Sequence, residues 1–278
     1  MSVNLQRLQA LKRQATGIAA KAPARPSVPP RSNPITAGQL RALLRLRVPQ
    51  GRSLSIACNR SLPGIEISPG LHLIESRLPS EPVPSVLCGA FCRRKELETA
   101  RMLFFDTETT GLAGGVGTRA FMIGAAHWEK DTLVVRQLLT ATLGAELAML
   151  DVFRSWLAGD TILASYNGKS YDAPLLRARF RLARMGDPTL GLDHVDLLHP
   201  TRRRYRGVYE NCRLATIERR VLGIMREDDL PGSEAPAAWL GYLRGGGSDL
   251  LRRVGQHNHQ DVVTLATLAC HLAALGDC

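Results

Sequence analysis

The sequence predicts an α/β fold, with helices packed on a sheet and a basic extension at the N-terminus. The apolar run Met102–Phe105 is typical of a buried central strand, because it is short and leads at once into polar residues and glycine. The stretch around Asp261 indicates a helix, because its apolar residues recur at helical spacing. These apolar positions are Val262, Leu265, Leu268, Ala269 and Leu272.

The basic extension follows from the charge distribution. Residues 1–101 contain 16 Lys and Arg against 5 Asp and Glu, a balance of +11, whereas residues 102–278 contain 20 of each. We therefore separate a basic N-terminal region from a main domain at 102–278. A basic region beside an acidic site favours a polyanionic partner through counterion release and steering. The alternative is an arm that is merely soluble, and charge alone does not separate the two.

The basic region has three predicted parts. Residues 1–16 contain leucines at the spacing of one short amphipathic helix. Residues 17–36 are rich in Ala, Pro and Ser, which is typical of a flexible linker. Within 37–101, leucines near residue 43 indicate a second short helix, and alternating apolar residues at 52–78 predict a small β element. This element would pack on the main domain or act as a separate grip for a substrate.

Asp106 and Glu108 follow the predicted strand directly. Because side chains alternate along a strand, both carboxylates point to the same face where the strand ends. Two carboxylates on one face raise each other's pKa unless a cation lies between them. Mg²⁺ and Mn²⁺ prefer such oxygen ligands. The alternative is a solvated turn, which needs neither the apolar strand before the pair nor the Thr-Thr-Gly after it.

Two further acidic residues have distinct settings. Asp172 follows the turn-like Ser165–Gly168 and precedes Pro174, which suits the first turn of a helix, so Asp172 is expected at or beside an N-cap. Asp261 lies on the predicted C-terminal helix, where His257, four residues earlier, shares its face. Taken alone, Asp172 is a capping residue, and His257 is a core or capping histidine.

The three acidic segments resemble the Exo I, II and III motifs of the DEDD-type (DnaQ-like) 3′–5′ exonucleases, and most closely the YprB-type branch. The motifs are Leu103–Leu112, Asn167–Leu176 and His257–Leu268. The similarity extends over roughly residues 102 to 275. It includes the connecting segments 107–118, Asp196–Pro200, Cys212–Glu218 and Asp228–Gly232.

The resemblance implies a ribonuclease H-like fold, with a mixed central sheet flanked by helices, and a site for two Mg²⁺ or Mn²⁺ ions. It implies four metal ligands: Asp106, Glu108, Asp172 and Asp261. Asp106 would bridge both ions. Glu108 and Asp261 would complete the site of the attacking water, and Asp172 would serve the metal at the leaving group. The implied activity is a 3′–5′ exonuclease on single-stranded DNA or RNA.

His257 is the candidate general base that takes a proton from the attacking water, a role that its unperturbed pKa of about 6.5 suits. In the family, the tyrosine subclass carries Tyr four residues before the last Asp, and the histidine subclass carries His five residues before it. Here the histidine has the tyrosine's spacing. The subclass and the identity of the base therefore both stay open.

Several polar and basic residues are expected to contact the substrate. The run Arg202–Tyr205 combines cations with an aromatic ring, which suits the phosphates and stacked bases of a single strand. A solvated basic loop is the alternative. Asp196 ends a short predicted strand and is either an auxiliary ligand or an acceptor behind the ligands. The tentative substrate contacts are Thr109, Thr110, Asn167, Arg202, Arg203, Arg204 and Tyr205.

Other functions remain open from the sequence. The four carboxylates would serve an endonuclease equally well. A catalytically weak module that binds nucleic acid or a protein partner is the alternative from a different class. The sequence predicts neither DNA over RNA nor an oligomeric state. No apolar run approaches the ~20 residues that a membrane span needs, and no secretory signal opens the chain, so we expect a cytoplasmic protein without a membrane partner.

Overall fold

The computed structural model describes residues 58–111, 117–227 and 229–276. All of them belong to one compact unit, Ile56–Cys278. The two short helices and the linker expected before residue 50 lie outside the described residues.

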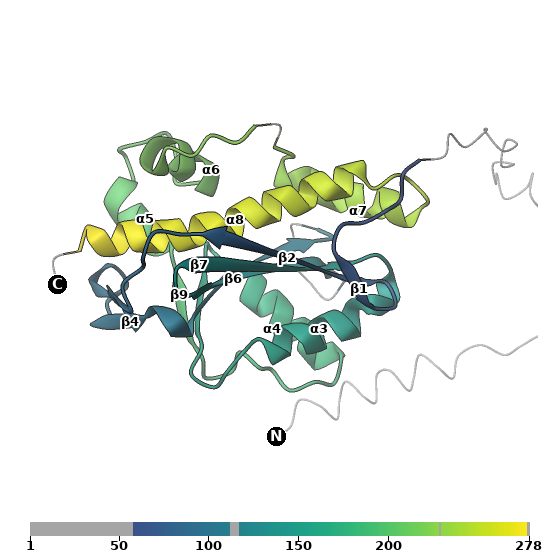
Figure 1. Cartoon of the computed structure of the whole chain (residues 1–278), viewed down its shortest axis with the longest axis horizontal. Helices are drawn as coiled ribbons and strands as arrows, with labels where there is room; N and C mark the ends of the chain where they lie inside the picture. The colour runs from purple at the N-terminus through teal and green to yellow at the C-terminus, as the bar shows by residue number, and fades with distance from the viewer. Residues whose placement is uncertain (1–57, 112–116, 228, 277–278) are drawn as a thin grey trace, which may run out of the picture. The chain divides into compact units, whose positions relative to one another are not determined.

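A seven-stranded mixed sheet forms the centre of this unit (Figure 1), with the strand order β1-β2-β7-β6-β5-β8-β9. Neighbouring strands run antiparallel from β1 to β5 and parallel from β5 to β9, which confirms the mixed sheet. The strands are β1 (Ile65–Ser68), β2 (Leu71–Pro79), β5 (Met102–Thr109), β6 (Ala120–Glu129), β7 (Thr132–Thr140), β8 (Ile162–Ser165) and β9 (Asp193–Asp196). A separate two-stranded sheet consists of β3 (Val86–Cys88) and β4 (Glu96–Glu98).

Helices cover both faces of the sheet. In Figure 1, α3 and α4 lie on one face, and α8 with α7 lies on the other. The helix predicted around Asp261 is α8, which has 26 residues. The described α-helices are α3 (Glu146–Ser155), α4 (Asp172–Leu182), α5 (Leu198–Tyr205), α6 (Leu214–Ile217), α7 (Ala235–Leu243) and α8 (Asp249–Ala274).

The strand predicted at Met102–Phe105 is β5, and it has apolar neighbours on both faces. Phe105 packs in a cluster with Phe153 of α3 and Phe180 of α4. Phe104 points to the opposite face and packs in the cluster beneath α8. Because β6 and β8 also pair with β5 on either side, the strand is buried all round, as its continuous apolar run predicts.

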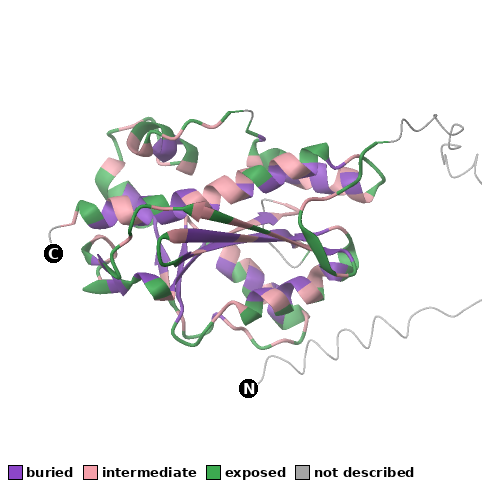
Figure 2. Ribbon diagram, viewed as in Figure 1, coloured by how far each residue is buried: buried purple, intermediate pink, exposed green. Residues whose placement is uncertain are grey.

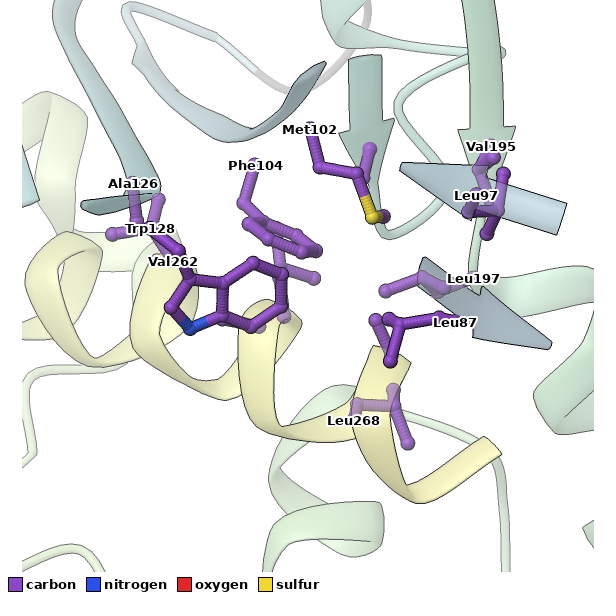
Figure 3. Close-up of a cluster of buried hydrophobic side chains, with 14 of the residues drawn as sticks. Leu87, Leu97, Met102, Phe104, Ala126, Trp128, Val195, Leu197, Val262 and Leu268 are labelled. Carbon is purple, nitrogen blue, oxygen red and sulfur yellow. The ribbon is translucent and has the colours of Figure 1, made fainter. Parts of the chain in front are cut away.

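The cluster beneath α8 fixes that helix on β5. Figure 3 shows Phe104 beside Trp128 of β6, whose rings meet edge to face with centroids 5.0 Å apart. Val262 and Leu268 of α8 belong to the same cluster. Buried residues also concentrate along the sheet and the inner side of α8 in Figure 2. This packing sets the polar residues in the middle of α8 beside the end of β5.

The β element expected at 52–78 corresponds in part to β1 and β2, which extend the main sheet. β2 pairs with β7 from Leu71 to Pro79, over its whole length. Among the residues that the structure describes, no helix combines the length and apolarity that crossing a bilayer requires.

Candidate active site

The end of β5 presents Asp106 and Glu108 to the face that α8 covers. Both continue the alternation of Phe104, which packs beneath α8. Asp106 lies against that helix, because the side chain of Asn258 donates a hydrogen bond to Asp106 Oδ2 at 3.0 Å. Glu108 is 7% exposed. The two carboxylates therefore share one partly enclosed face.

A buried amide pair fixes the hydrogen bond to Asp106. Gln137 of β7 donates to Asn258 Oδ1 at 2.9 Å and to the carbonyl oxygen of Gly255 at 2.8 Å. Asn258 is fully buried, and it fits only because residue 124 on β6 is glycine. A Cβ atom at Gly124 would lie 2.1 Å from Asn258 Oδ1. The amide of Asn258 thus has one supported orientation, with its NH₂ group toward Asp106.

Asp172 is the first residue of α4. The hydroxyl of Thr107, on β5, donates a hydrogen bond to Asp172 Oδ1. This contact joins the start of α4 to the strand that carries Asp106 and Glu108. The structure records no side-chain hydrogen bond that caps α4 at its preceding residue, Tyr171.

Asp196 holds the turn that leads into α4. Its carboxylate accepts hydrogen bonds from the backbone N–H groups of Asn167 at 2.8 Å, Lys169 at 3.2 Å and Leu198 at 3.1 Å. Of the two roles expected for Asp196, these contacts match an acceptor behind the site. Asn167 has a left-handed backbone, with φ of 67°, a conformation that Asn adopts more readily than most residues.

Asp261 on α8 is bound by an arginine. Arg226 donates from Nη2 to Asp261 Oδ1 and also makes two hydrogen bonds of 2.6 Å to Glu218. Glu218 is 1% exposed and accepts a further hydrogen bond from the hydroxyl of Thr264. A buried glutamate and its arginine therefore hold one oxygen of Asp261 in place.

His257 lies on the same face of α8. A proton on its Nδ1 allows a hydrogen bond to Asp229, whereas a bare Nδ1 would instead accept one from Arg226. Its Nδ1 lies 2.7 Å from Asp229 Oδ1 and 3.1 Å from Arg226 Nη1. Its Nε2 lies 3.6 Å from Asp261 Oδ2, on the side of the acidic residues. A proton on Nδ1 that is donated to Asp229 leaves the lone pair on Nε2, where a base at this site needs it.

The four acidic residues are close enough to change one another's ionisation. Burial raises the pKa of Asp106 well above its usual value, and the charges of the other three raise it further. Burial also raises the pKa of Glu108 to about 7 and that of Asp172 to about 6. It raises the pKa of Asp261, although nearby cationic groups oppose that shift. The site thus gathers carboxylates from β5, α4 and α8 without enough positive charge to balance them.

The chemistry of these groups fits a divalent hard cation, since carboxylates with raised pKa values gain most from a cation among them. These carboxylates do not already surround one ion position. In the described part of the chain, no three His, Cys, Asp or Glu side chains already surround a common ion position. Asn258, Thr107 and Arg226 each occupy one oxygen of an acidic residue. The candidate residues for holding an ion are Asp106, Glu108, Asp172 and Asp261.

A pocket of about 390 Å³ adjoins the acidic residues, and we call it the active-site pocket. Thr109 and Asn167, two of the expected substrate contacts, line it. Thr110 does not, and its hydroxyl accepts a hydrogen bond from the backbone of Arg119 at 3.0 Å. The lining residues are Asp106, Thr107, Thr109, Gly111, Thr118, Tyr166, Asn167, Tyr171, Asp172 and Leu175.

The cluster expected at Arg202–Tyr205 forms the end of α5, and none of its residues lines the active-site pocket. Tyr205 packs on His271 of α8, with its hydroxyl 2.7 Å from His271 Nε2. Its ring is thus already partnered within the protein. Arg203 lines a separate pocket together with Lys169.

Sequence reasoning did not single out the residues that support the site: Gln137, Glu218, Arg226, Asp229 and Asn258. Asn258 had a signal available, since it lies three residues before Asp261 on the predicted helix and therefore near its face. Arg226 and Asp229 lie between elements, where no periodicity indicates which way a side chain points.

Comparison with known proteins supports this reading of the fold. The family described as "RNase_H superfamily" matches residues 103–273. A protein of Bacillus subtilis (strain 168), named "Uncharacterized protein YprB", is 39% identical over 173 residues, which are 62% of this chain and 42% of that protein. The match thus spans less than half of the relative's length.

Solved structures show more distant likeness. The family B DNA polymerase of the hyperthermophilic archaeon Pyrobaculum calidifontis is 15% identical, with a TM-score of 0.48 over 62% of this chain and 24% of that one. Exonuclease I is 18% identical, with a TM-score of 0.38 over 58% of this chain and 44% of that one. Since the family match covers more than half of the sequence and contains all four acidic residues, this chain belongs to the RNase H superfamily.

Proposed function

We propose that this protein is a metal-dependent nuclease, and specifically a 3′–5′ exonuclease on single-stranded nucleic acid. The observation that carries the proposal is the convergence of four acidic residues from β5, α4 and α8, whose pKa values are all raised by burial. Repulsion from other members of the set raises the pKa values of Asp106 and Glu108 further. A protein that only binds a polyanion gains nothing from gathering carboxylates, because they repel phosphate.

Asp106, Glu108, Asp172 and Asp261 are the proposed ligands of two Mg²⁺ or Mn²⁺ ions. When bound, such ions lower the pKa of an attacking water and neutralise charge at the scissile phosphate. Asn258 keeps Asp106 in place for this role. Arg226 occupies Asp261 Oδ1, whereas Oδ2 lies 3.6 Å from His257 Nε2.

His257 is the proposed general base, and Asp229 is the residue that orients it. Asp229 holds Nδ1 at 2.7 Å, so that the Nε2 lone pair is available on the acidic side. Asp229 and His257 would act as a carboxylate–histidine pair, in which the carboxylate fixes the tautomer and the orientation of the ring. This geometry favours His257 over Tyr166, whose hydroxyl donates to the carbonyl oxygen of Cys212 at 2.7 Å.

The 3′–5′ direction rests on the resemblance to DEDD exonucleases. The active-site pocket would take the terminal nucleotide, with Thr109 and Asn167 at its wall. The carboxylates alone do not distinguish cleavage from the 3′ end from internal cleavage. The direction of degradation must therefore be determined by experiment.

The decisive experiment follows 5′-labelled single-stranded DNA and RNA oligonucleotides with Mg²⁺, Mn²⁺ or EDTA. Asp106→Asn removes the central carboxylate, and Asp131→Asn, in the exposed turn between β6 and β7, is the matched control. We expect a metal-dependent ladder shortening from the 3′ end, absent in Asp106→Asn and unchanged in Asp131→Asn. Internal fragments would reject the exonuclease in favour of an endonuclease.

One observation favours a second candidate, a binding module without turnover. Arg226 already neutralises Asp261, so part of the negative charge is balanced by the protein itself. Such a module would cleave neither strand with any metal. Its Asp106→Asn variant would bind oligonucleotides as tightly as the parent protein or more tightly, because one repulsive charge is gone.

A further inference from the structure

A second pocket lies on the other side of the turn before α4, and we call it the basic pocket. It has a volume of about 380 Å³. It is lined by Cys92, Arg93, Arg94, Lys169, His194, Asp196, His199, Pro200 and Arg203. These residues come from the end of η1 (Ala90–Cys92) and the segment after it, from the β8–α4 turn, and from β9 and α5. Four cationic side chains from three separate segments thus meet at one hollow.

The basic pocket has more positive than negative charge available to a ligand. Arg94 is paired with Asp193. Among the described residues, no acidic side chain forms an ion pair with Arg93, Lys169 or Arg203, and all three are exposed. Bringing unpaired cations together is unfavourable, so an anionic ligand would relieve the repulsion.

Contacts within the protein hold this arrangement. Arg94 ties the segment after η1 to β9 through Asp193, with Nε at 2.5 Å from Asp193 Oδ2, and its Nη1 donates to the carbonyl oxygen of Cys92 at 3.1 Å. Arg93 has a left-handed backbone, with φ of 62°. Arg203 donates to the carbonyl oxygen of Phe91. The cations therefore extend from fixed backbone positions.

The two pockets share a wall, which is the turn from Asn167 to Tyr171. Asn167 and Tyr171 line the active-site pocket, and Lys169 between them lines the basic pocket. Asp196 fixes both sides at once, because it accepts hydrogen bonds from the N–H groups of Asn167 and Lys169. The two pockets therefore adjoin the same short turn, Asn167 to Tyr171.

We propose that the basic pocket binds a backbone phosphate of the substrate strand, on the 5′ side of the nucleotide in the active-site pocket. The proposal rests on the proposed nuclease function for the direction of the strand. Arg93, Lys169 and Arg203 would contact the phosphate oxygens, and Arg202 and Arg204 of the same helix would extend the positive surface. Substrates long enough to reach the pocket are then bound more tightly than a dinucleotide, whose single backbone phosphate is the one to be cut.

Binding is measured with the non-cleaving Asp106→Asn protein, by fluorescence anisotropy of a labelled single-stranded 16-mer over a series of salt concentrations. The test variant adds Arg93→Ala and Lys169→Ala. The matched control adds Arg154→Ala and Arg181→Ala, two exposed arginines on α3 and α4 that carry the same charge. We expect the test variant to bind at least tenfold more weakly. We also expect the slope of log K against log salt to become shallower by about 0.7 for each lost phosphate contact.

Cleavage of an unlabelled dinucleotide, followed by chromatography with Asp106 intact, separates this proposal from the nuclease function. The Arg93→Ala, Lys169→Ala double variant should cleave the dinucleotide with an unchanged kcat/KM. Its kcat/KM for the 16-mer should fall. The proposed phosphate site would be rejected if the double variant bound the 16-mer with unchanged affinity and salt slope. It would also be rejected if kcat/KM fell equally for the dinucleotide and the 16-mer. If the parent protein cuts nothing but 16-mer binding still depends on Lys169 and Arg93, the nuclease proposal fails and the phosphate site stands. Absence of any oligonucleotide binding would reject both.

Discussion

At the scale of single residues, buried charge decides what a substitution does. The guanidinium group of Arg226 forms ion pairs with both Glu218 and Asp261. Burial lowers the pKa of Arg226, but these two carboxylates keep it above its usual value. The cost of burying such groups is offset only while all partners are present. Asp229, by contrast, is an exposed residue whose carboxylate contacts His257 and Arg226. The two residues therefore allow stability and turnover to be probed separately.

Arg226→Met should destabilise the protein by about 3 kcal/mol, because it leaves Glu218 and Asp261 buried without their cation. The measurement is urea unfolding of the metal-free protein. Arg219→Met is the control, since Arg219 pairs with Glu210 at the surface and such pairs contribute about 0–1 kcal/mol. Equal stability of the two variants would show that the Arg226 contacts are not needed for the fold.

Asp229→Asn should lower kcat by about 10- to 100-fold and leave KM and the melting temperature nearly unchanged, because it releases the His257 ring without emptying a buried site. Single-turnover cleavage and oligonucleotide binding are both measured. Glu227→Gln, an exposed neighbour, serves as the control. A parallel loss of binding, or no change in kcat, would contradict a positioning role for Asp229.

At the scale of elements, the site depends on how closely α8 approaches the sheet. Asn258 reaches Asp106 only because β6 carries glycine at position 124. The side of the site away from α8 depends on the β8–α4 turn. Asp196 accepts hydrogen bonds from two N–H groups of this turn and from the N–H group of Leu198. Each side of the site therefore depends on a residue that holds other groups in place: Asn258 holds Asp106, and Asp196 holds the turn before α4.

Gly124→Ala should destabilise the protein by about 1–3 kcal/mol and reduce cleavage, because the new methyl group would displace the Asn258 amide. Thermal unfolding and the oligonucleotide assay report the two effects. Gly144→Ala provides the comparison, since an added Cβ there meets no atom within 4 Å. If Gly124→Ala behaves like Gly144→Ala, the close approach of Asn258 does not hold the site together.

At the scale of the whole molecule, the sequence predicted the elements with strong periodicity and missed the contacts between them. β5 and α8 were predictable because one is a continuous apolar run and the other has a helical apolar stripe. The faces on which Asp106, Glu108 and Asp261 lie were predictable from their positions along these two elements. The orientation of Tyr205 was not, because α5 turns that ring onto α8 through tertiary packing. Nor was Arg226, whose three acidic partners lie 8, 3 and 35 positions away.

The metal-free protein should become less stable as pH rises from about 5 to 8. Glu108 and Asp172 have pKa values of about 7 and 6 in the folded protein, above the values of about 4.3 and 3.9 in unfolded chains. The folded state thus holds more protons in this window, and stability is lost as pH rises through the folded pKa values. For Glu108 the loss is on the order of 3 kcal/mol.

Thermal unfolding in EDTA across this pH range tests whether stability falls as pH rises. Mg²⁺ or Mn²⁺ should reduce the loss, because a cation among the carboxylates stabilises their ionised form. The double variant Asp106→Asn, Glu108→Gln should show a flatter profile than the parent protein. Stability that rises over this range would mean that the carboxylates are already balanced by the protein.

The hydrogen bond between Asn258 and Asp106 joins residues 152 positions apart. Closing so long a loop costs entropy that packing of the core must offset, so we expect the contact to form late in folding. A chain emerging from the ribosome carries β5 long before α8 has been synthesised. Until then Asp106 lacks its amide partner, and Asp261 and His257 do not yet exist. A growing chain therefore carries Asp106 and Glu108 on β5 before it has the α8 groups that contact this site in the folded protein.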